Sequence, residues 1–317
     1  MSHNQLSKFT VILFYKFTPI EQPEALARIH RQKCEKLGLR GRMIIAKEGI
    51  NATLEGEGAA IEEYKKFLHA DPVFADVLVK ESVGNGFAFP KLKVKVRNEV
   101  VTLGAGNFNF ESETAAKLSA AELQKWYERD EDFAVLDLRN DYEIASGKFD
   151  KTFNPGLENF RDLPKKLAKP ELAELKNKKL VAVCTGGIRC EKATCLLKRQ
   201  GFENVYQLEH GIHTYIKEHP GPESRFKGTL FVFDNRMTTE VMPSSAGSGS
   251  VREKIGRCVF CGGTTENYCS DDSFRPSRKI LCCPSCFDEK RANFRVSGSG
   301  SGANLRPSVE HATLISR

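Results

Sequence analysis

The sequence contains no apolar run of the ~18 residues that a membrane-spanning helix requires. Its N-terminal residues are polar, and the apolar segment that follows is interrupted by Lys16, so we expect neither a signal peptide nor a membrane partner. A Walker-type phosphate loop is absent, and the pair Gly104 and Gly106 lacks the third glycine of a dinucleotide-binding loop. These absences exclude membrane-spanning proteins and the common nucleotide-binding classes. They predict a cytoplasmic protein with no evident organic cofactor.

The composition bounds the architecture and the possible partners. A chain of 317 residues with 40% hydrophobic residues is long enough for two or three domains with real cores. In a cytoplasmic protein, ten cysteines are expected to be thiols, metal ligands or catalytic groups rather than disulfides. The net charge of +7 suits an anionic partner, although an ordinary soluble enzyme can carry the same charge.

The stretch from Leu180 to Ala193 has the clearest chemical meaning. An apolar run ends at Cys184, two glycines and Arg189 follow, and good helix formers come next. This pattern predicts a buried strand, a tight loop and a helix to about residue 201. Inward-pointing loop amides and the positive end of the helix would both favour an anion on the sulfur. Such surroundings lower the pKa of a cysteine thiol from its usual value of about 8.5.

Cys184 and Arg189 are therefore the candidate catalytic residues, and Arg189 is expected to add a fixed positive charge. The rest of the candidate active loop consists of Thr185, Gly186, Gly187, Ile188 and Cys190. A cysteine at the end of a strand is often only a small buried apolar residue, but such a residue needs no glycine pair after it. Cys190, on the first turn of the helix, is the competing reactive thiol. Cys195 is expected to serve helix packing.

The N-terminal third alternates between strand and helix patterns. We expect strands at 8–17, 41–46, 52–54 and 77–80, and amphipathic helices at 21–37 and 59–68. This order is typical of a ferredoxin-like α+β domain. A later strand pattern places four basic residues on one face: Lys91, Lys93, Lys95 and Arg97. This basic strand could bind RNA phosphates, or it could be the solvated edge of a sheet.

Strands and helices alternate again in the middle of the chain, which predicts an α/β domain with a parallel sheet and helices on both sides. Ser119 and Glu122 form a capping pair at the start of one helix. The expected strands are 133–139, 179–183, 204–208 and, after the domain, 231–236. Asp137 and Arg139 lie at the end of the first of these, where we expect a scaffold role rather than catalysis.

Four cysteines near the C-terminus form two Cys-x2-Cys pairs, namely Cys258, Cys261, Cys283 and Cys286. Four thiolates at this spacing suit a structural Zn²⁺ ion, with an iron–sulfur cluster or redox thiols as alternatives. Cys282 could replace Cys283 as a ligand, and Cys269 has no evident partner. The intervening basic residues Arg275, Arg278 and Lys279 suit contact with RNA.

Composition changes divide the chain into five segments. They are a ferredoxin-like domain with the basic strand (1–110), the α/β domain (111–225), a strand extension with a Ser/Gly-rich linker (226–250), a cysteine-rich module (251–296) and a disordered tail (297–317). The linker proper is expected at 243–250.

The spacing Cys-x4-Arg between a strand and a helix resembles the active loop of rhodanese domains, whose cysteine at the position of Cys184 carries a persulfide sulfur. Dual-specificity phosphatases of similar fold have a loop one residue longer, which disfavours phosphatase chemistry. The full string from Cys184 to Ala193 resembles the rhodanese-type tRNA uridine hydroxylase family, and the strings at 48–51 and 233–236 match it as well. Rhodaneses commonly have Gly-Gly where this sequence has His210 and Gly211. His210 and His213 could face the active loop as an acid or a base, although we expect such histidines to be capping or surface residues.

The resemblance implies an oxidoreductase that acts on tRNA and hydroxylates the wobble uridine at carbon 5, with molecular oxygen as co-substrate. Cys184 would add to the pyrimidine ring as a nucleophile, or it would carry a persulfide, and Arg189 with the loop amides would stabilise the anion. Two other functions stay open from the residues alone. One is a persulfide sulfurtransferase, and the other is a non-catalytic RNA-binding scaffold.

Overall fold

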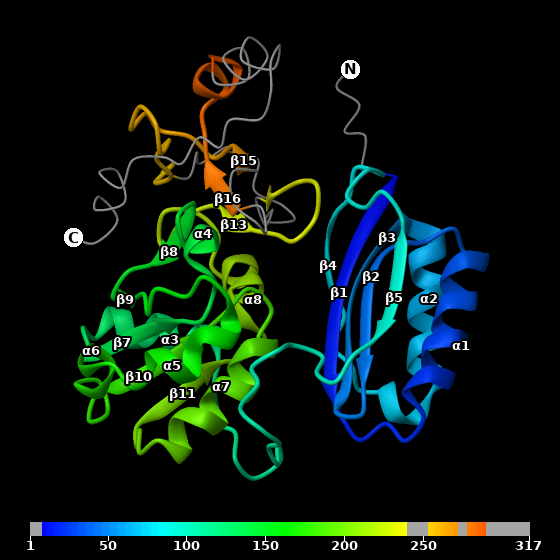
Figure 1. The fold of residues 1–317 in the computed structure, drawn as a ribbon, viewed down its shortest axis with the longest axis horizontal. Coiled ribbons are helices and arrows are strands. Elements are labelled where there is room, and N and C mark those ends of the chain that lie inside the picture. The colour runs from blue at the N-terminus through cyan, green and yellow to red at the C-terminus, as the bar shows by residue number, and fades with distance from the viewer. Residues whose placement is uncertain (1–7, 240–252, 272–277, 290–317) are drawn as a thin grey trace, which may run out of the picture.

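The computed structural model describes residues 8–239, 253–271 and 278–289. Figure 1 shows an N-terminal domain beside a second, α/β domain, with a small C-terminal module next to the second domain. Among the described residues, no helix combines the length and the apolar character needed to cross a membrane. Arg275, the predicted linker at 243–250 and the predicted tail at 297–317 lie outside the described residues.

The N-terminal domain contains a five-stranded sheet in the order β4-β1-β3-β2-β5. Its strands are β1 (Phe9–Phe17), β2 (Arg40–Ala46), β3 (Gly49–Glu57), β4 (Lys80–Val83) and β5 (Leu92–Val96). Its helices are α1 (Pro23–Lys36), α2 (Gly58–Ala70) and the short 3-10 helix η1 (Pro72–Phe74), and α1 and α2 cover one face of the sheet (Figure 1). The order of the first four strands confirms the ferredoxin-like arrangement, to which β5 adds a parallel strand beside β2.

One strand of this domain lies later in the chain than expected. The strand predicted at 77–80 begins at Lys80 and runs to Val83. The reason is that the chain is still turning before it, because Val77 N donates to Phe74 O at 3.1 Å. Val77 itself is buried in the core of the domain.

The two faces of β1 have different partners. Ile12 and Phe14 are fully buried in the core that includes residues of α1 and α2. Leu13 and Tyr15 point to the opposite face, because successive side chains of a strand alternate. Lys80 lies opposite Leu13 in the β1–β4 pair and therefore shares that face. This second face contacts the α/β domain.

The second domain contains a parallel five-stranded sheet in the order β6-β11-β10-β7-β9. Its strands are β6 (Ala116–Leu118), β7 (Phe133–Asp137), β9 (Thr152–Phe153), β10 (Lys179–Val183) and β11 (Val205–Leu208). Its helices are α3 (Ala120–Glu128), α4 (Asp141–Ile144), η2 (Phe160–Asp162), α5 (Leu163–Lys166), α6 (Pro170–Ala173), α7 (Ile188–Arg199) and α8 (Gly211–Glu218). In β10, Leu180 and Ala182 belong to one apolar core, whereas Val181 and Val183 belong to another. Both faces of the sheet are therefore covered, which confirms the predicted α/β architecture.

Local contacts explain two element ends in this domain. Ser119 Oγ accepts a hydrogen bond from Glu122 N at 3.1 Å, so the predicted helix cap is confirmed. The strand predicted at 133–139 ends at Asp137, because the Asp137 carboxylate accepts from Arg139 N at 3.1 Å and turns the chain. The Arg139 guanidinium is buried and donates to Asp137 Oδ2 at 2.6 Å and to Gly147 O at 2.7 Å. This pair fixes the loops that follow β7.

The remaining strands are short and join the C-terminal part to the α/β domain. They are β8 (Gly147–Phe149) with β12 (Phe226–Gly228), β13 (Leu230–Phe231) with β14 (Thr238–Thr239), and the hairpin of β15 (Tyr268–Asp271) and β16 (Arg278–Leu281). The strand predicted at 231–236 is wrong beyond Phe231. There the Asp234 carboxylate accepts from Arg236 N at 3.0 Å and closes a turn.

Buried ion pairs join the first two domains. Lys192, in α7, has a fully buried side chain and pairs with Glu48 at 2.8 Å and with Glu99 at 2.5 Å. Asn51 Nδ2 donates to Val100 O at 3.1 Å, and Glu48 accepts from Val100 N at 2.7 Å. The string at 48–51 is therefore more than a turn, since it anchors the helix that begins at the candidate active loop.

Candidate active site and metal site

The candidate active loop connects β10 to α7. Cys184 directly follows β10, and α7 begins at Ile188. Gly187 has a φ of 100°, a left-handed conformation that glycine adopts without strain. Its amide donates a hydrogen bond to Cys184 Sγ at 3.1 Å. The loop thus aims a backbone amide at the sulfur, in the way that the glycine pair predicts.

The surroundings of Cys184 favour its thiolate. Burial of this fully buried side chain acts to raise the pKa of its thiol. The hydrogen bond from the Cys190 thiol, the charge of Arg189 and the amides of Arg189 and Gly187 outweigh burial and lower the pKa to about 6. Cys184 is therefore mostly a thiolate at pH 7.

The two other cysteines of α7 have the opposite electrostatics. Burial raises the pKa of the Cys190 thiol well above its usual value, and its hydrogen bond to Cys184 raises the pKa further. Burial also raises the pKa of Cys195 to about 12, and Cys195 Sγ donates to Glu191 O at 3.1 Å. Cys190 is thus a protonated donor to Cys184 rather than its competitor.

Arg189 is paired with a buried carboxylate. Its guanidinium donates to both oxygens of Glu143, at 2.6 and 2.8 Å, and Glu143 has no exposed surface. Glu143 also accepts from Asn140 N at 2.8 Å, which ties it to the start of α4. This bidentate pair holds the arginine rigidly beside the loop. It also neutralises much of the fixed positive charge that the sequence analysis assigns to Arg189.

Two residues of the N-terminal domain reach the loop, and the sequence analysis missed both. Lys80 Nζ donates to Gly186 O at 3.0 Å, and Tyr15 OH donates to Glu191 Oε1 at 3.4 Å. Lys80 Nζ also lies 5.3 Å from the centre of the Tyr15 ring. Lys80 and Gly186 are 106 positions apart in the chain, so no local pattern reveals their contact.

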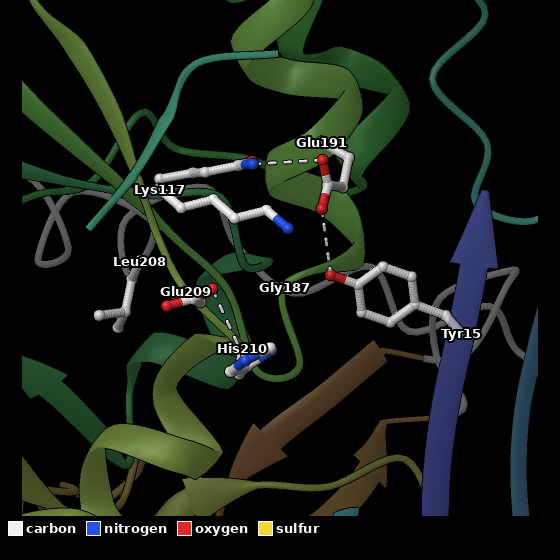
Figure 2. A pocket seen from close by; sticks show the side chains of 8 residues that line it. Tyr15, Lys117, Gly187, Glu191, Leu208, Glu209 and His210 are labelled. Atoms are coloured by element: carbon white, nitrogen blue, oxygen red, sulfur yellow. Dashed lines mark hydrogen bonds and ion pairs between the residues drawn. The ribbon is translucent and has the colours of Figure 1, made fainter. Parts of the chain in front are cut away.

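The pocket in Figure 2 lies between β1 and α7, beside the active loop. Its lining residues are Tyr15, Lys117, Gly187, Glu191, Gln207, Leu208, Glu209 and His210. Glu191 binds Tyr15 at 3.4 Å and accepts from Gln207 Nε2 at 3.2 Å, so its carboxylate bridges β1 and β11. Charged groups of both signs line this pocket, and such a lining suits ordered water better than an apolar ligand.

The two histidines of this region lie closer to the loop than expected. His210 lines the pocket beside Gly187. His213 is 7% exposed, and its amide donates to Thr185 O at 3.0 Å. Burial lowers the pKa of His213 to about 4, so this imidazole is neutral at pH 7. The expectation of a capping or surface residue is wrong for His213, because α8 packs its first turn against the active loop.

A partly exposed aromatic residue lies beside Arg189. Phe233 follows β13 and is 46% exposed, and the centre of its ring lies 5.7 Å from Arg189 Cζ. The Phe231 ring packs against it with ring centres 5.3 Å apart. The chain after β13 thus adds an aromatic surface next to the active loop.

The four predicted metal ligands come together in the C-terminal module. The sulfur atoms of Cys258, Cys261, Cys283 and Cys286 lie within 4.8 Å of one another. Cys261 Sγ and Cys283 Sγ are 3.7 Å apart. Tetrahedral Zn–S bonds of about 2.3 Å place their sulfurs about 3.8 Å apart, so the cluster can hold one metal ion. Cys282 does not belong to this set, because its thiol contacts that of Cys269.

Comparison with known proteins finds relatives over most of the chain. Three family models match it: a UPF0176 acylphosphatase like domain at 9–100, a Rhodanese-like domain at 119–218 and a Rhodanase C-terminal region at 227–297. A tRNA uridine(34) hydroxylase of Onion yellows phytoplasma is 37% identical over 284 residues, which cover 89% of each chain. A relative of the same name from Cytophaga hutchinsonii is 36% identical over 281 residues, covering 89% of this chain and 86% of that protein. The chain belongs to the tRNA uridine(34) hydroxylase family.

Membership of the tRNA uridine(34) hydroxylase family confirms the resemblance drawn from the active-loop string. The Rhodanese-like match spans both Cys184 and Arg189, and the UPF0176 match spans Tyr15 and Lys80. The contacts between Lys80 and the active loop therefore join two regions that are matched separately in this family.

The basic strand of this family member forms an edge of the N-terminal sheet. The side chains of Lys91, Lys93, Lys95 and Arg97 are all exposed, while Val94 between them is buried. Among the described strands, β5 pairs only with β2. The charges form a row at the sheet edge, and this geometry fits both RNA binding and a solvated edge.

Proposed function

We propose that this member of the tRNA uridine(34) hydroxylase family hydroxylates carbon 5 of the wobble uridine of cytoplasmic tRNA, with molecular oxygen as the oxidant. The observation that carries the proposal is the anionic sulfur of Cys184, which accepts the Gly187 amide and has its pKa lowered to about 6. A thiolate is nucleophilic enough to add to an electron-poor pyrimidine ring. The names of relatives that align over 89% of the chain support the choice of substrate.

In the proposed reaction, the thiolate activates the base. The Cys184 sulfur forms a bond to carbon 6, and the electron pair of the ring double bond moves toward carbon 5 and the oxygen on carbon 4. Carbon 5 then forms a bond to an oxygen atom derived from O₂. Loss of the proton from carbon 5 and expulsion of the Cys184 thiolate restore the double bond. The second oxygen atom leaves as water, using two electrons and two protons from a thiol reductant that is oxidised to a disulfide.

The protein's own groups stabilise the sulfur before addition and after expulsion. The Gly187 amide and the Cys190 thiol donate hydrogen bonds to it, and Arg189 lies beside it. Glu143 keeps the Arg189 guanidinium in one position through two hydrogen bonds. Groups fixed in this way need no rearrangement when negative charge returns to the sulfur.

We assign the tRNA contacts and the metal to the two flanking parts. The exposed row of Lys91, Lys93, Lys95 and Arg97 would bind phosphates of tRNA. The cysteine cluster would hold a structural zinc ion, since its four sulfurs are close enough for tetrahedral coordination. Four protein ligands would leave no open position, so the module would brace the enzyme rather than take part in the reaction.

The test uses the purified chain, unmodified tRNA, a dithiol reductant and ¹⁸O₂. Nucleoside mass spectrometry should detect 5-hydroxyuridine carrying one ¹⁸O, and Cys184→Ala should abolish it. Cys195→Ala is the matched control. Cys195 is a cysteine of α7, the helix that follows the active loop, and its thiol has a pKa raised to about 12. Product that carries no ¹⁸O would overturn the role of oxygen. Thiolated nucleosides in place of 5-hydroxyuridine would establish the sulfurtransferase instead.

A further inference from the structure

A buried lysine of the N-terminal domain contacts the active loop. Lys80, the first residue of β4, is 7% exposed, and its Nζ donates to Gly186 O at 3.0 Å. Its neighbour across the sheet is Leu13, which also touches this loop, since a Cβ atom added at Gly186 would lie 3.0 Å from Leu13 Cδ2. The N-terminal sheet thus holds an ammonium group in a fixed position against the loop that carries Cys184.

The charges around this lysine leave its ammonium available to the sulfur. Within the described residues, no carboxylate lies within ion-pair distance of Lys80, whereas Arg189 is paired with Glu143 at 2.6 Å. The other charged groups that act on Lys80 are Cys184 and Glu191. Glu191 is held by hydrogen bonds from Tyr15 and Gln207. The electron-rich face of the Tyr15 ring, 5.3 Å from Nζ, further favours the cation.

We propose that Lys80 is a positioning residue of this active site: its ammonium, fixed by the N-terminal domain, stabilises negative charge on Cys184 and holds the Gly186 carbonyl in place. The N-terminal domain then completes the active site in addition to contacting RNA. The effect on the sulfur exists without tRNA, so it can be measured whether or not the chain hydroxylates uridine.

The protonation states agree with this role. Burial lowers the pKa of Lys80 to about 8, although Cys184 and Glu191 act to raise it. Since the pKa of Cys184 is about 6, thiolate and ammonium coexist from about pH 6 to about pH 8. The neighbouring His213 is neutral in this range because burial lowers its pKa to about 4. His210 has its pKa lowered by burial and by Lys80, so it adds no competing cation.

The test measures alkylation of Cys184 by iodoacetamide as a function of pH, resolved by peptide mass spectrometry. Lys80→Gln removes the charge but keeps a hydrogen-bond donor, and it should raise the midpoint of the Cys184 profile by up to about one pH unit. Lys80→Arg should keep the wild-type midpoint. Lys65→Gln, which removes a lysine paired with Glu62 and Glu81 on the helical side of the sheet, is the control.

The midpoint of the alkylation profile distinguishes a change in the charge near Cys184 from a change in the access of the reagent to the buried sulfur. A looser domain interface would change the rate at every pH by one factor and leave the midpoint in place. An unchanged midpoint in Lys80→Gln would therefore overturn the proposal. If Lys80→Gln does not fold, Lys80→Met provides the same comparison, since it removes the same charge with an apolar side chain of similar length. The Cys184 midpoint of Lys80→Met should then lie above that of wild type and of Lys65→Gln.

A second observation concerns the exposed ring of Phe233. Its backbone position is fixed, because the Asp234 carboxylate binds the Arg236 guanidinium at 2.6 Å. The same guanidinium donates to Val83 O at 2.7 Å in the N-terminal domain. Phe233 therefore presents 46% of its surface at a rigid junction, with Arg189 of the active loop 5.7 Å from the ring centre.

We infer that Phe233 is a stacking platform for an unpaired base of the tRNA substrate beside the active loop. This inference rests on the proposed function. Proteins that bind unpaired RNA commonly stack bases on exposed aromatic rings, and one such contact contributes about 1–3 kcal/mol. The Arg189 guanidinium, although paired with Glu143, contacts the ring and helps to fix its orientation.

The test compares Phe233→Leu with Phe233→Tyr and with Phe87→Leu. Phe87 is 74% exposed, and its carbonyl accepts from Asn235 at the same junction, so it is a matched exposed phenylalanine. Phe233→Leu should raise the KM for tRNA about 5- to 160-fold with kcat retained, while the other two stay near wild type. Binding of an anticodon stem-loop, measured separately by photocrosslinking from 5-iodouridine, should show the same order. Equal effects of Phe233→Leu and Phe87→Leu on both readouts would overturn the inference, whereas crosslinking to Phe233 without turnover would reject only the proposed hydroxylation.

Discussion

The molecule contains two cysteine sites built on opposite principles. In the active loop, one sulfur, that of Cys184, is surrounded by a glycine amide, a thiol donor and an arginine. In the C-terminal module, four sulfurs lie within 4.8 Å of one another. The first site stabilises a single negative charge with groups of the protein. The second concentrates four potential negative charges, which only a metal cation can compensate fully.

This difference shows that the surroundings decide what a cysteine does. Cys184 follows a strand and precedes a helix, so the backbone itself supplies donors and a positive helix end. In the part of the module that the structure describes, the strands are one hairpin of two four-residue strands. We therefore expect this small module to depend on a metal ion for its stability, whereas the active loop rests on the core of a complete domain.

The strongest test of the comparison removes one sulfur from each site. Cys258→Ser should reduce bound zinc from about one equivalent per chain to nearly none, because structural zinc depends on all of its thiolates. Cys184→Ser should keep the zinc and lose turnover. Metal content measured by plasma mass spectrometry on both purified variants gives the result. Zinc that stays with Cys258→Ser, or leaves with Cys184→Ser, would remove the distinction between the sites.

A second test removes the carboxylate that is paired with Arg189 beside Cys184. Glu143→Gln leaves the buried guanidinium without its partner. It should lower the free energy of unfolding by about 3–5 kcal/mol, as the loss of one partner of a buried ion pair does. The only tryptophan, Trp126, is buried in the core of the α/β domain, so its fluorescence in denaturant reports the unfolding of that domain. Zinc content should not change.

The control for this test is an exposed ion pair at the C-terminal module. Glu158→Gln removes the partner of Arg278, 2.9 Å away, and both side chains are at least half exposed. Exposed pairs of this kind contribute at most about 1 kcal/mol. A loss of stability in Glu143→Gln no larger than in Glu158→Gln would show that Arg189 does not depend on its carboxylate.

A third test is confined to the hydrogen bonds of the active loop. Cys190→Ala removes the thiol that donates to Cys184, so the pKa of Cys184 should rise from about 6 by about one unit. The folded protein then loses thiolate as the pH falls through about 7 instead of about 6. The alkylation profile of Cys184 measures this shift directly. A profile that keeps its wild-type midpoint would mean that the amides, Arg189 and Lys80 determine the charge of the sulfur without the Cys190 thiol.

Both cysteine sites could be predicted from the sequence because their decisive residues are close together in it. Cys184, Gly187 and Arg189 occur within six positions, and each metal-ligand pair is a Cys-x2-Cys string. The longer strands of the two larger domains could be predicted for the same reason, since alternation and helical spacing are local. The edge strands β6 and β9 could not, because three and two residues are too few to show a pattern. The strand expected at 231–236 was wrong beyond Phe231. The apolar residues there suggest a strand, but the Asp234 carboxylate accepts hydrogen bonds from the Arg236 backbone and side chain and turns the chain.

The contacts of Lys80 and Tyr15 with the loop could not be predicted. They depend on how two separately folded domains dock, and residues 106 positions apart carry no shared local pattern. The pairing of Arg189 with Glu143 could not be predicted either, because the two residues are 46 positions apart and no local pattern links them. Nor does the sequence show that Glu143 is buried, and burial is what converts a surface charge into a fixed partner.

The smallest expected effect is on RNA binding. It tests whether the C-terminal module contacts tRNA in addition to its expected role in binding a metal. Both the basic strand and Lys279 in the module have the charge that suits phosphate contacts. Lys93 is exposed on β5, whereas Lys279 Nζ donates to Ser270 Oγ at 2.6 Å within its own hairpin. Lys93→Gln should therefore reduce the slope of log affinity against log salt by about one, and Lys279→Gln should leave it unchanged. Affinities for one tRNA at several salt concentrations provide both slopes. Equal reductions would make the module part of the RNA-binding surface, and its cysteine cluster would then support substrate binding as well as folding.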